Sequence, residues 1–332
     1  MEVPSIGSLN TTGQGGFNGT KLGNSTGDLF ILMLALSCPS LLICLLGIAG
    51  NGIVLWFLCL SLKRNKFTVY ILNLAVADIT ILLISSVVPL YILFIPIVVE
   101  VSHFIPNALF NLRLLFFFGY TTSLFLLTAI SVERCLSVLF PIWHRCQRPK
   151  HQSSFVCALL WMSSILVIAL ERIICGEDNY VYRSQDCTTM QIFIAVFFLL
   201  VVPLVMVFSS LTLIIKIWRT SQRHLSSRLY MVIIITVITF FTFSMPVQSI
   251  HILWYFQVLS HSFDSFLVVC YLSVFCASIN SAVNPFIYFL VGRQKKQEVQ
   301  GLKGVLDRVF KDEEETRNEE ETPNLHVSRG EV

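Results

Sequence analysis

Residues 188–215 read TTMQIFIAVFFLLVVPLVMVFSSLTLII, a run without a single Asp, Glu, Lys or Arg. A helix needs about 20 mostly apolar residues to cross the hydrocarbon core of a bilayer, and this run exceeds that length. Lipid offers no hydrogen-bond partners to backbone groups, so a membrane-spanning segment must pair them internally, as a helix does. The run therefore predicts a transmembrane helix.

Six further stretches of the same kind accompany it. They are residues 29–62, 67–99, 107–132, 152–170, 229–257 and 265–292. One of them contains Asp78 and another Arg113, and the remaining four carry no charged residue of these types. Composition agrees, because only 13% of the residues are charged, against about 25% in a soluble domain. We predict an all-α membrane protein whose seven transmembrane helices occupy residues 29–291.

Basic residues predict how the chain lies in the membrane. They are concentrated in the first, third and fifth joints between the spans and just after the last span. These residues are Lys63, Arg64, Lys66, Arg145, Arg148, Lys150, Lys216, Arg219, Arg223, Arg228, Arg293, Lys295 and Lys296. Basic loops remain in the cytoplasm. We therefore expect a multi-pass plasma-membrane protein with an extracellular N-terminus and a cytoplasmic C-terminus.

The two ends of the chain lie outside the predicted spans. Residues 1–28 form the expected extracellular tail, in which Asn10, Asn18 and Asn24 each begin an Asn-X-Ser/Thr triplet that can accept a glycan. Residues 292–311 have apolar side chains spaced as in an amphipathic helix lying on the inner leaflet. Residues 312–332 are rich in acids and form the expected cytoplasmic tail.

Asp78 is the only acid within the predicted spans. A charge inside a membrane helix is costly and usually functional. Small polar residues of other spans could meet it, namely Asn51, Ser123, Asn280, Ser281 and Asn284. Two readings stay open: the group could hold a sodium ion with water, or it could be a hydrogen-bonded knot between helices. Sodium is the only cofactor that the sequence suggests.

Glu133 and Arg134 close the third span on the side predicted to be cytoplasmic. Arg134 either snorkels to the interface and pairs with Glu133, or it is a switch residue that faces a cytoplasmic partner. Pro203, Pro246 and Pro285 interrupt the last three spans, where a proline bends a helix and either forms a hinge or shapes a cavity.

Together these features resemble the rhodopsin-like G-protein-coupled receptors. The motifs that carry the resemblance are Gly50-Asn51, Leu74, Asp78, Glu133-Arg134-Cys135, Pro203, Pro246 and Asn284-Pro285-Phe286-Ile287-Tyr288. A narrower resemblance is to the Mas-related receptors, carried by TAISVERCLSVLFPIW at residues 128–143, by RPK at 148–150 and by FLVG at 289–292. Ser244-Met245-Pro246 is more similar to the Mas branch than to the itch-receptor branch.

The narrower resemblance implies a disulfide. Most rhodopsin-like receptors join the third span to the second outer loop, but no cysteine lies between Cys59 and Cys135 here. Mas-related receptors instead join the outer ends of spans four and five, which implies a bond between Cys175 and Cys187. The alternative is two free thiols.

The resemblance also implies a ligand site. In some Mas-related receptors two acids hold a cationic ligand, and the matching positions here are Glu171 and Gln191, so half of the acidic pair is missing. Glu171 could instead pair with Arg172 or Arg113, and Arg113 could equally meet a carboxylate ligand. Helix position alone adds further pocket-wall candidates, which are Tyr91, Tyr120, Trp254, Tyr255 and Asp264.

The function implied is a receptor that binds an extracellular peptide or small molecule and activates heterotrimeric G proteins of the calcium-mobilising or inhibitory class. The residues implied in coupling and activation are Glu133, Arg134, Pro246, Asn284, Pro285 and Tyr288. Residues 216–228 contain no acid, so Arg134 has no salt-bridge partner there, which predicts high basal activity. The expected partners are the ligand, the G protein and membrane lipid, and not nucleic acid.

Other functional classes fit less well. An opsin needs a lysine in the last span, and residues 265–292 contain none. An intramembrane protease needs paired acids or a Ser/His pair, whereas Asp78 is alone and His251 has no evident serine partner. A transporter would show half-repeats. We therefore expect no enzyme, and the remaining alternative is a receptor-like trafficking or scaffold protein.

Overall fold

The computed structural model describes residues 19–60, 66–94, 105–149, 151–176, 182–219, 234–256 and 263–293, and within these ranges every regular element is helical. The first four long helices are α1 (Gly19–Leu60), α2 (Lys66–Phe94), α3 (Ile105–Leu139) and α4 (Gln152–Ile174). The fifth span consists of α6 (Gln185–Val196), a π-helical turn (Phe197–Val201) and α7 (Val202–Arg219). The sixth runs over Ile234–Tyr255 and ends in α9 (Met245–Tyr255), and the seventh is α10 (Phe263–Arg293).

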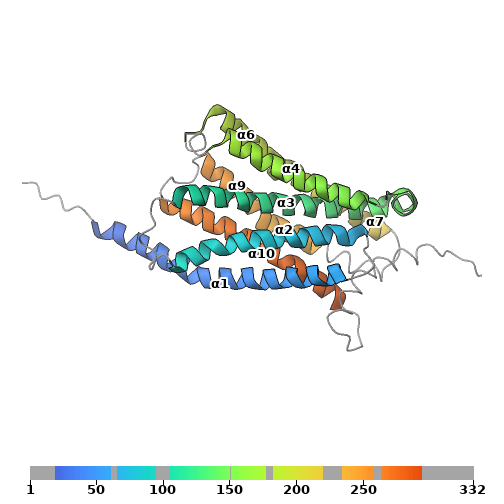
Figure 1. Cartoon of the computed structure of the whole chain (residues 1–332), viewed down its shortest axis with the longest axis horizontal. Helices are drawn as coiled ribbons and strands as arrows, with labels where there is room; N and C mark the ends of the chain where they lie inside the picture. Colours follow the sequence, from blue (N-terminus) through green and yellow to red (C-terminus); the bar gives the residue numbers. More distant parts are fainter. Residues whose placement is uncertain are drawn as a thin grey trace, which may run out of the picture.

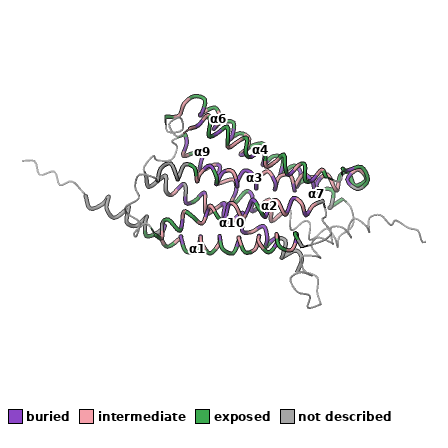
Figure 2. The backbone as a smooth tube through the Cα atoms, viewed as in Figure 1, coloured by how far each residue is buried: buried purple, intermediate pink, exposed green. Residues whose placement is uncertain are grey.

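The helices form one bundle whose long axes run roughly together (Figure 1). Six spans are long and apolar enough to cross a bilayer, and α10 contributes a shorter apolar segment, Tyr271–Ile287. Large apolar side chains such as Trp56, Phe155 and Phe208 are exposed. The outer sides of α1 and α4 are largely exposed (Figure 2). Such a surface suits lipid and not water. The predicted seven-helix membrane fold is confirmed.

The centre of the bundle is built around α3. Its residues Tyr120 and Leu124 pack against Phe198 and Met206 of the fifth span and Phe240 of the sixth. On the opposite side α1 meets α10 closely, because a Cβ added at Gly47 would lie 2.8 Å from the Cβ of Ala282. Close approach of this kind is typical of membrane helices that carry small residues where they touch.

The prolines affect the last three spans differently. The π-helical turn Phe197–Val201 precedes Pro203, and a second one, Phe240–Ser244, precedes Pro246. A proline lacks an N–H and crowds the preceding turn, and a widened turn relieves that crowding. Pro285 lies inside α10, which continues to Arg293 as a single helix. The prolines at which bends are predicted in spans five and six thus each follow a π-helical turn.

The two ends of the chain differ in how far the structure describes them. α1 begins at Gly19, so residues 19–28, including Asn24, are helical although they belong to the expected N-terminal tail. Asn10 and Asn18 lie outside the described residues, as do nearly all of the predicted amphipathic helix and the acidic tail. Glycosylation and these terminal segments stay predictions.

Candidate functional site

A disulfide between Cys175 and Cys187 joins the end of α4 to the start of α6. Ser184 begins α6 as its N-cap, with the side chain accepting a hydrogen bond from the backbone N–H of Cys187 at 3.3 Å. Both sulfurs are buried against Tyr255 of α9. The bond is the one implied by the family resemblance, and we call this side of the bundle the disulfide end.

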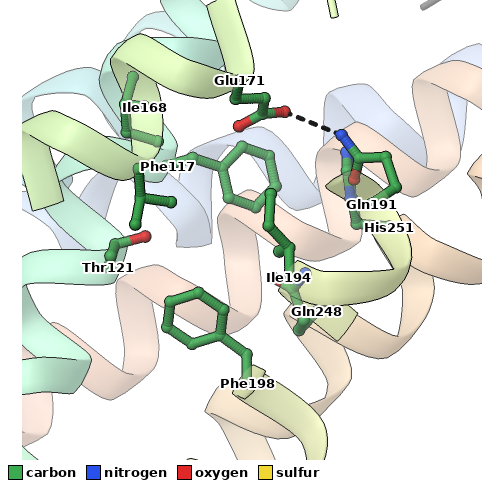
Figure 3. A pocket seen from close by; sticks show the side chains of 10 residues that line it. Phe117, Thr121, Ile168, Glu171, Gln191, Ile194, Phe198, Gln248 and His251 are labelled. Carbon is green, nitrogen blue, oxygen red and sulfur yellow. Dashed lines mark hydrogen bonds between the residues drawn. The ribbon is translucent and has the colours of Figure 1, made fainter. Parts of the chain in front are cut away.

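Four polar side chains from four different helices meet just inside the disulfide end. Arg113 Nη1 of α3 donates to Glu171 Oε1 of α4 at 3.1 Å and lies 3.2 Å from His251 Nε2 of α9. Gln191 Nε2 of α6 donates to the same Glu171 oxygen at 3.2 Å (Figure 3). Of the alternatives open for Glu171, the structure therefore contains the pairing with Arg113.

A pocket lies next to this cluster. It is lined by Phe117, Thr121, Val167, Ile168, Glu171, Gln191, Ile194, Phe198, Gln248 and His251. Figure 3 shows Phe198 and Thr121 on the side away from Glu171. At about 10 Å³, the pocket has room for about one water molecule. A ligand larger than a water molecule must therefore widen the pocket or bind between the pocket and the disulfide end.

The ligand-binding candidates predicted from the sequence differ in how close they lie to this pocket. Glu171 lines it and Arg113 binds Glu171 at its edge. Tyr120 lies deeper and donates to the Ser244 carbonyl at 2.5 Å, and Trp254 packs near the disulfide. Asp264 is in α10, but its side chain is outside the described part of the structure.

Two polar residues of the pocket wall, Gln248 and His251, are not among the ligand-binding candidates predicted from the sequence. They lie in α9 three positions apart, a spacing that places them on the same face of a helix. A signal was present, since an amide and an imidazole stand out in the middle of a mostly apolar span. The sequence points to His251 only as a histidine without an evident catalytic serine, and the structure places it at the pocket.

In the middle of the bundle Asp78 is completely buried among polar groups. Ser123 Oγ donates to Asp78 Oδ1 at 2.9 Å, and Asn284 Nδ2 donates to Asp78 Oδ2 at 2.7 Å. The Ser281 side chain lies beside the same carboxylate. Asn51 binds the Ser281 backbone carbonyl at 3.1 Å. The structure thus brings together these polar residues of four spans.

Asn280 and Asn284 take different places in α10. Asn280 is buried, but within the described part of the bundle it makes no hydrogen bond to Asp78. Asn284, which the family resemblance groups with the coupling residues, binds Asp78 directly. Its neighbour Pro285 packs closely against α1, because a Cβ added at Gly50 would lie 3.2 Å from the Cβ of Pro285. The side chain of Tyr288 is not among those that the structure describes.

At the opposite side of the bundle, which we call the Arg134 end, Glu133 is paired with Arg148 and not with Arg134. Arg148 Nη2 donates to Glu133 Oε1 at 2.9 Å, and Tyr70 Oη donates to the same oxygen at 2.8 Å. The Arg134 guanidinium lies over the Phe67 ring at 4.8 Å. The expected alternative of a Glu133–Arg134 pair is therefore wrong, because Arg148 occupies the carboxylate.

Comparisons with known proteins agree with this architecture. Residues 50–288 match the family model described as 7 transmembrane receptor (rhodopsin family). The chain is 45% identical over 283 residues to Proto-oncogene Mas of Rattus norvegicus, with 84% of each chain covered. It is 43% identical over 282 residues to the Homo sapiens protein of that name, again with 84% of each covered. It is also 42% identical over 285 residues to Mas-related G-protein coupled receptor member H of Rattus norvegicus, with 82% of each covered.

Proposed function

Because the chain belongs to the rhodopsin family of seven-transmembrane receptors, among Mas and the Mas-related G-protein coupled receptors, we propose that it binds an extracellular ligand at the disulfide end and activates a heterotrimeric G protein at the Arg134 end. Its relatives are receptors and not enzymes. In this proposal the N-terminus is extracellular and the C-terminus cytoplasmic, as the basic joints indicate.

The observation that carries the proposal is the placement of Arg134. Its guanidinium is half-buried over an aromatic ring, and no carboxylate among the described residues pairs with it. An arginine held at the end of a bundle without a counter-ion can receive acceptor groups of a partner. A trafficking or scaffold protein would have no physical need for this arrangement.

The ligand site is the pocket together with the polar cluster at its edge. Arg113 offsets the charge of Glu171, so the pair offers no unbalanced negative charge to a cation. Gln191 must point its NH₂ group at Glu171, because the reverse orientation would set two acceptors against each other. Its Oε1 is buried and has no hydrogen-bond partner in the described part of the bundle. These features support a peptide or small molecule that donates a hydrogen bond, and they argue against a dication.

A ligand screen tests this proposal. Cells expressing the chain are assayed for calcium and cyclic-nucleotide responses to peptides with one, two or no cationic side chains and to small anions. Glu171→Gln breaks the pair with Arg113, and we expect it to weaken the response to an active ligand about tenfold, as the loss of one charge-assisted hydrogen bond does. The matched control is Ser163→Ala, an exposed position of the same helix.

Two results of the screen would contradict the site assigned here. One is a response that Glu171→Gln leaves unchanged at equal surface level. The other is a clear preference for dicationic peptides, which the balanced pair disfavours. A chain that responds to no ligand and has no ligand-free signal would favour the trafficking or scaffold alternative.

We extend the proposal to a sodium ion at Asp78. The buried carboxylate is surrounded by hydroxyl and amide groups, and no cationic side chain among the described residues pairs with it. A buried charge without compensation is costly. Oxygens of Asp78, Ser123 and Ser281 form the kind of donor set that a hard cation accepts.

The sodium proposal is checked by thermal stability of the purified receptor. We expect a higher Tm in sodium chloride than in choline chloride at equal ionic strength, because the bulky choline cation cannot replace a small ion among buried oxygens. Asp78→Asn should remove the difference, since it removes the charge that attracts the ion. Equal Tm values of the unmodified chain in the two salts would refute the site.

A further inference from the structure

The cytoplasmic ends of the spans, in the orientation proposed above, hold a buried cluster of polar side chains. Glu133 accepts hydrogen bonds from Tyr70 and Arg148, and its Oε2 lies 3.7 Å from His144 Nε2. Arg148 Nη1 lies 2.6 Å from His144 Nε2, and Arg148 Nη2 donates to Ser153 Oγ at 2.8 Å. The cluster therefore links α2, α3, the π-helical turn Trp143–Gln147 and α4.

Arg148 is the residue that holds this cluster together. Its side chain is only 2% exposed, although it belongs to the joint between α3 and α4. A guanidinium can bind several acceptors in fixed directions at once, which a lysine ammonium does less well. Removing one partner of a buried ion pair leaves the other charged and unpaired. The Glu133 carboxylate is therefore committed to Arg148 as long as the joint keeps this conformation.

The commitment of Glu133 matters because Arg134 is its neighbour in α3. Two arginines can compete for the single carboxylate of Glu133: Arg134, which is next to it in sequence, and Arg148, which is next to it in space. Tyr70 and Arg148 both donate to Oε1, and Arg148 balances the charge of the carboxylate. His144 Nε2 accepts from Arg148 and lies 3.7 Å from Oε2, beyond hydrogen-bond distance. Within the described part of the chain, Arg134 is left with the face of Phe67, which binds a cation more weakly than a carboxylate does.

We infer that Arg148 is a positioning residue for coupling: it keeps Glu133 away from Arg134, so that Arg134 is available to a G protein even without a ligand. The inference rests on the function proposed above. Without Arg148, the buried Glu133 carboxylate needs another cation, and the Arg134 guanidinium is a permanently charged group at the same helix end, whereas His144 is charged only when protonated. That new pair would hold Arg134 back and lower ligand-free coupling.

The experiment measures ligand-free second-messenger signalling of the full chain at matched surface level. Arg148→Gln is made in the unmodified chain and in the Glu133→Gln background. In the unmodified chain it should lower ligand-free signalling about fivefold or more, the effect of a competing interaction of ordinary strength. In the Glu133→Gln background it should cause no further fall, because no carboxylate remains to capture Arg134. Arg148→Lys, which keeps a cation, should retain most of the signal.

A second variant covers the case in which Arg148→Gln does not reach the surface. Tyr70→Phe removes one hydrogen bond to Glu133 and keeps the ring. It should lower ligand-free signalling in the unmodified chain and leave it unaltered in the Glu133→Gln background. This dependence on Glu133 separates a positioning role from a general loss of structure.

Three results would overturn the inference. The first is ligand-free signalling that Arg148→Gln leaves unchanged. The second is an equal fall in signalling in both backgrounds, which would mean that Arg148 contacts the G protein itself. The third is a chain with no ligand-free signal. In the last case an Arg134-dependent response to a ligand would keep the proposed function and remove only the inference. Signalling that survives Arg134→Ala would instead count against the proposed coupling site.

Discussion

Replacing Arg134 by alanine is expected to abolish G-protein coupling and to leave the amount of receptor at the cell surface unchanged. Coupling should fail because this guanidinium is half-buried over an aromatic ring and pairs with no carboxylate within the described residues, so it is available to a partner. The fold should survive, because Glu133 keeps Arg148 as its partner. The cation–π interaction with Phe67, which the substitution removes, is worth about 0.5–2 kcal/mol, and this is small against the stability of a domain.

The measurement is calcium and cyclic-nucleotide signalling, with and without an active ligand, at equal surface level. Arg172→Ala serves as the control, because it removes an exposed arginine at the disulfide end. Retained coupling in Arg134→Ala would show that another group receives the G protein. A loss of both surface level and signal would show that Arg134 supports the fold, contrary to the expectation.

The second large effect concerns the disulfide. Cys175→Ser and Cys187→Ser should each lower the surface yield to the same degree, and the double variant should be no worse than either. A bridge across this loop, whose cysteines are 12 residues apart, is expected to stabilise by about 3 kcal/mol. Both cysteines are also completely buried against Tyr255, so a serine there places a hydroxyl in apolar surroundings.

Surface immunostaining of intact cells measures the yield. Cys38→Ser is the matched control, because Cys38 is a free and exposed cysteine. Unequal losses in the two single variants, or a double variant that is clearly worse, would mean that the two cysteines act separately. A yield that no variant changes would mean that the bond is not needed for folding.

The seven spans could be predicted from the sequence because a long apolar run is a local property. Residues 188–215 need no knowledge of the rest of the chain to be recognised as a span. Asp78 could be singled out for the same reason, since any acid in such a run stands out. Its partners could be named only as candidates, and of these Ser123 and Asn284 bind it whereas Asn280 does not.

The remaining features depend on tertiary geometry. The partner of Glu133 could not be predicted, because Arg148 reaches it from just beyond a π-helical turn, fifteen residues further along the chain. A π-helical turn contains one residue more than an α-helical turn and leaves no reliable pattern in the sequence. The pairing of Arg113 with Glu171 was one of several alternatives, and only the approach of α3 to α4 selects it.

The way in which α4 is attached has a practical consequence for handling the receptor. Only 17% of the most apolar stretch of α4 is buried. Three polar contacts and one covalent bond along α4 therefore help to hold it to the rest of the chain. They join Ser153 to Arg148, Trp161 to Asn73, Glu171 to Arg113, and Cys175 to Cys187. Elements with few buried apolar contacts are the first to open. During extraction into detergent, a thiol reductant would break the one covalent bond that holds this helix, so α4 is the part of the bundle that purification conditions must protect.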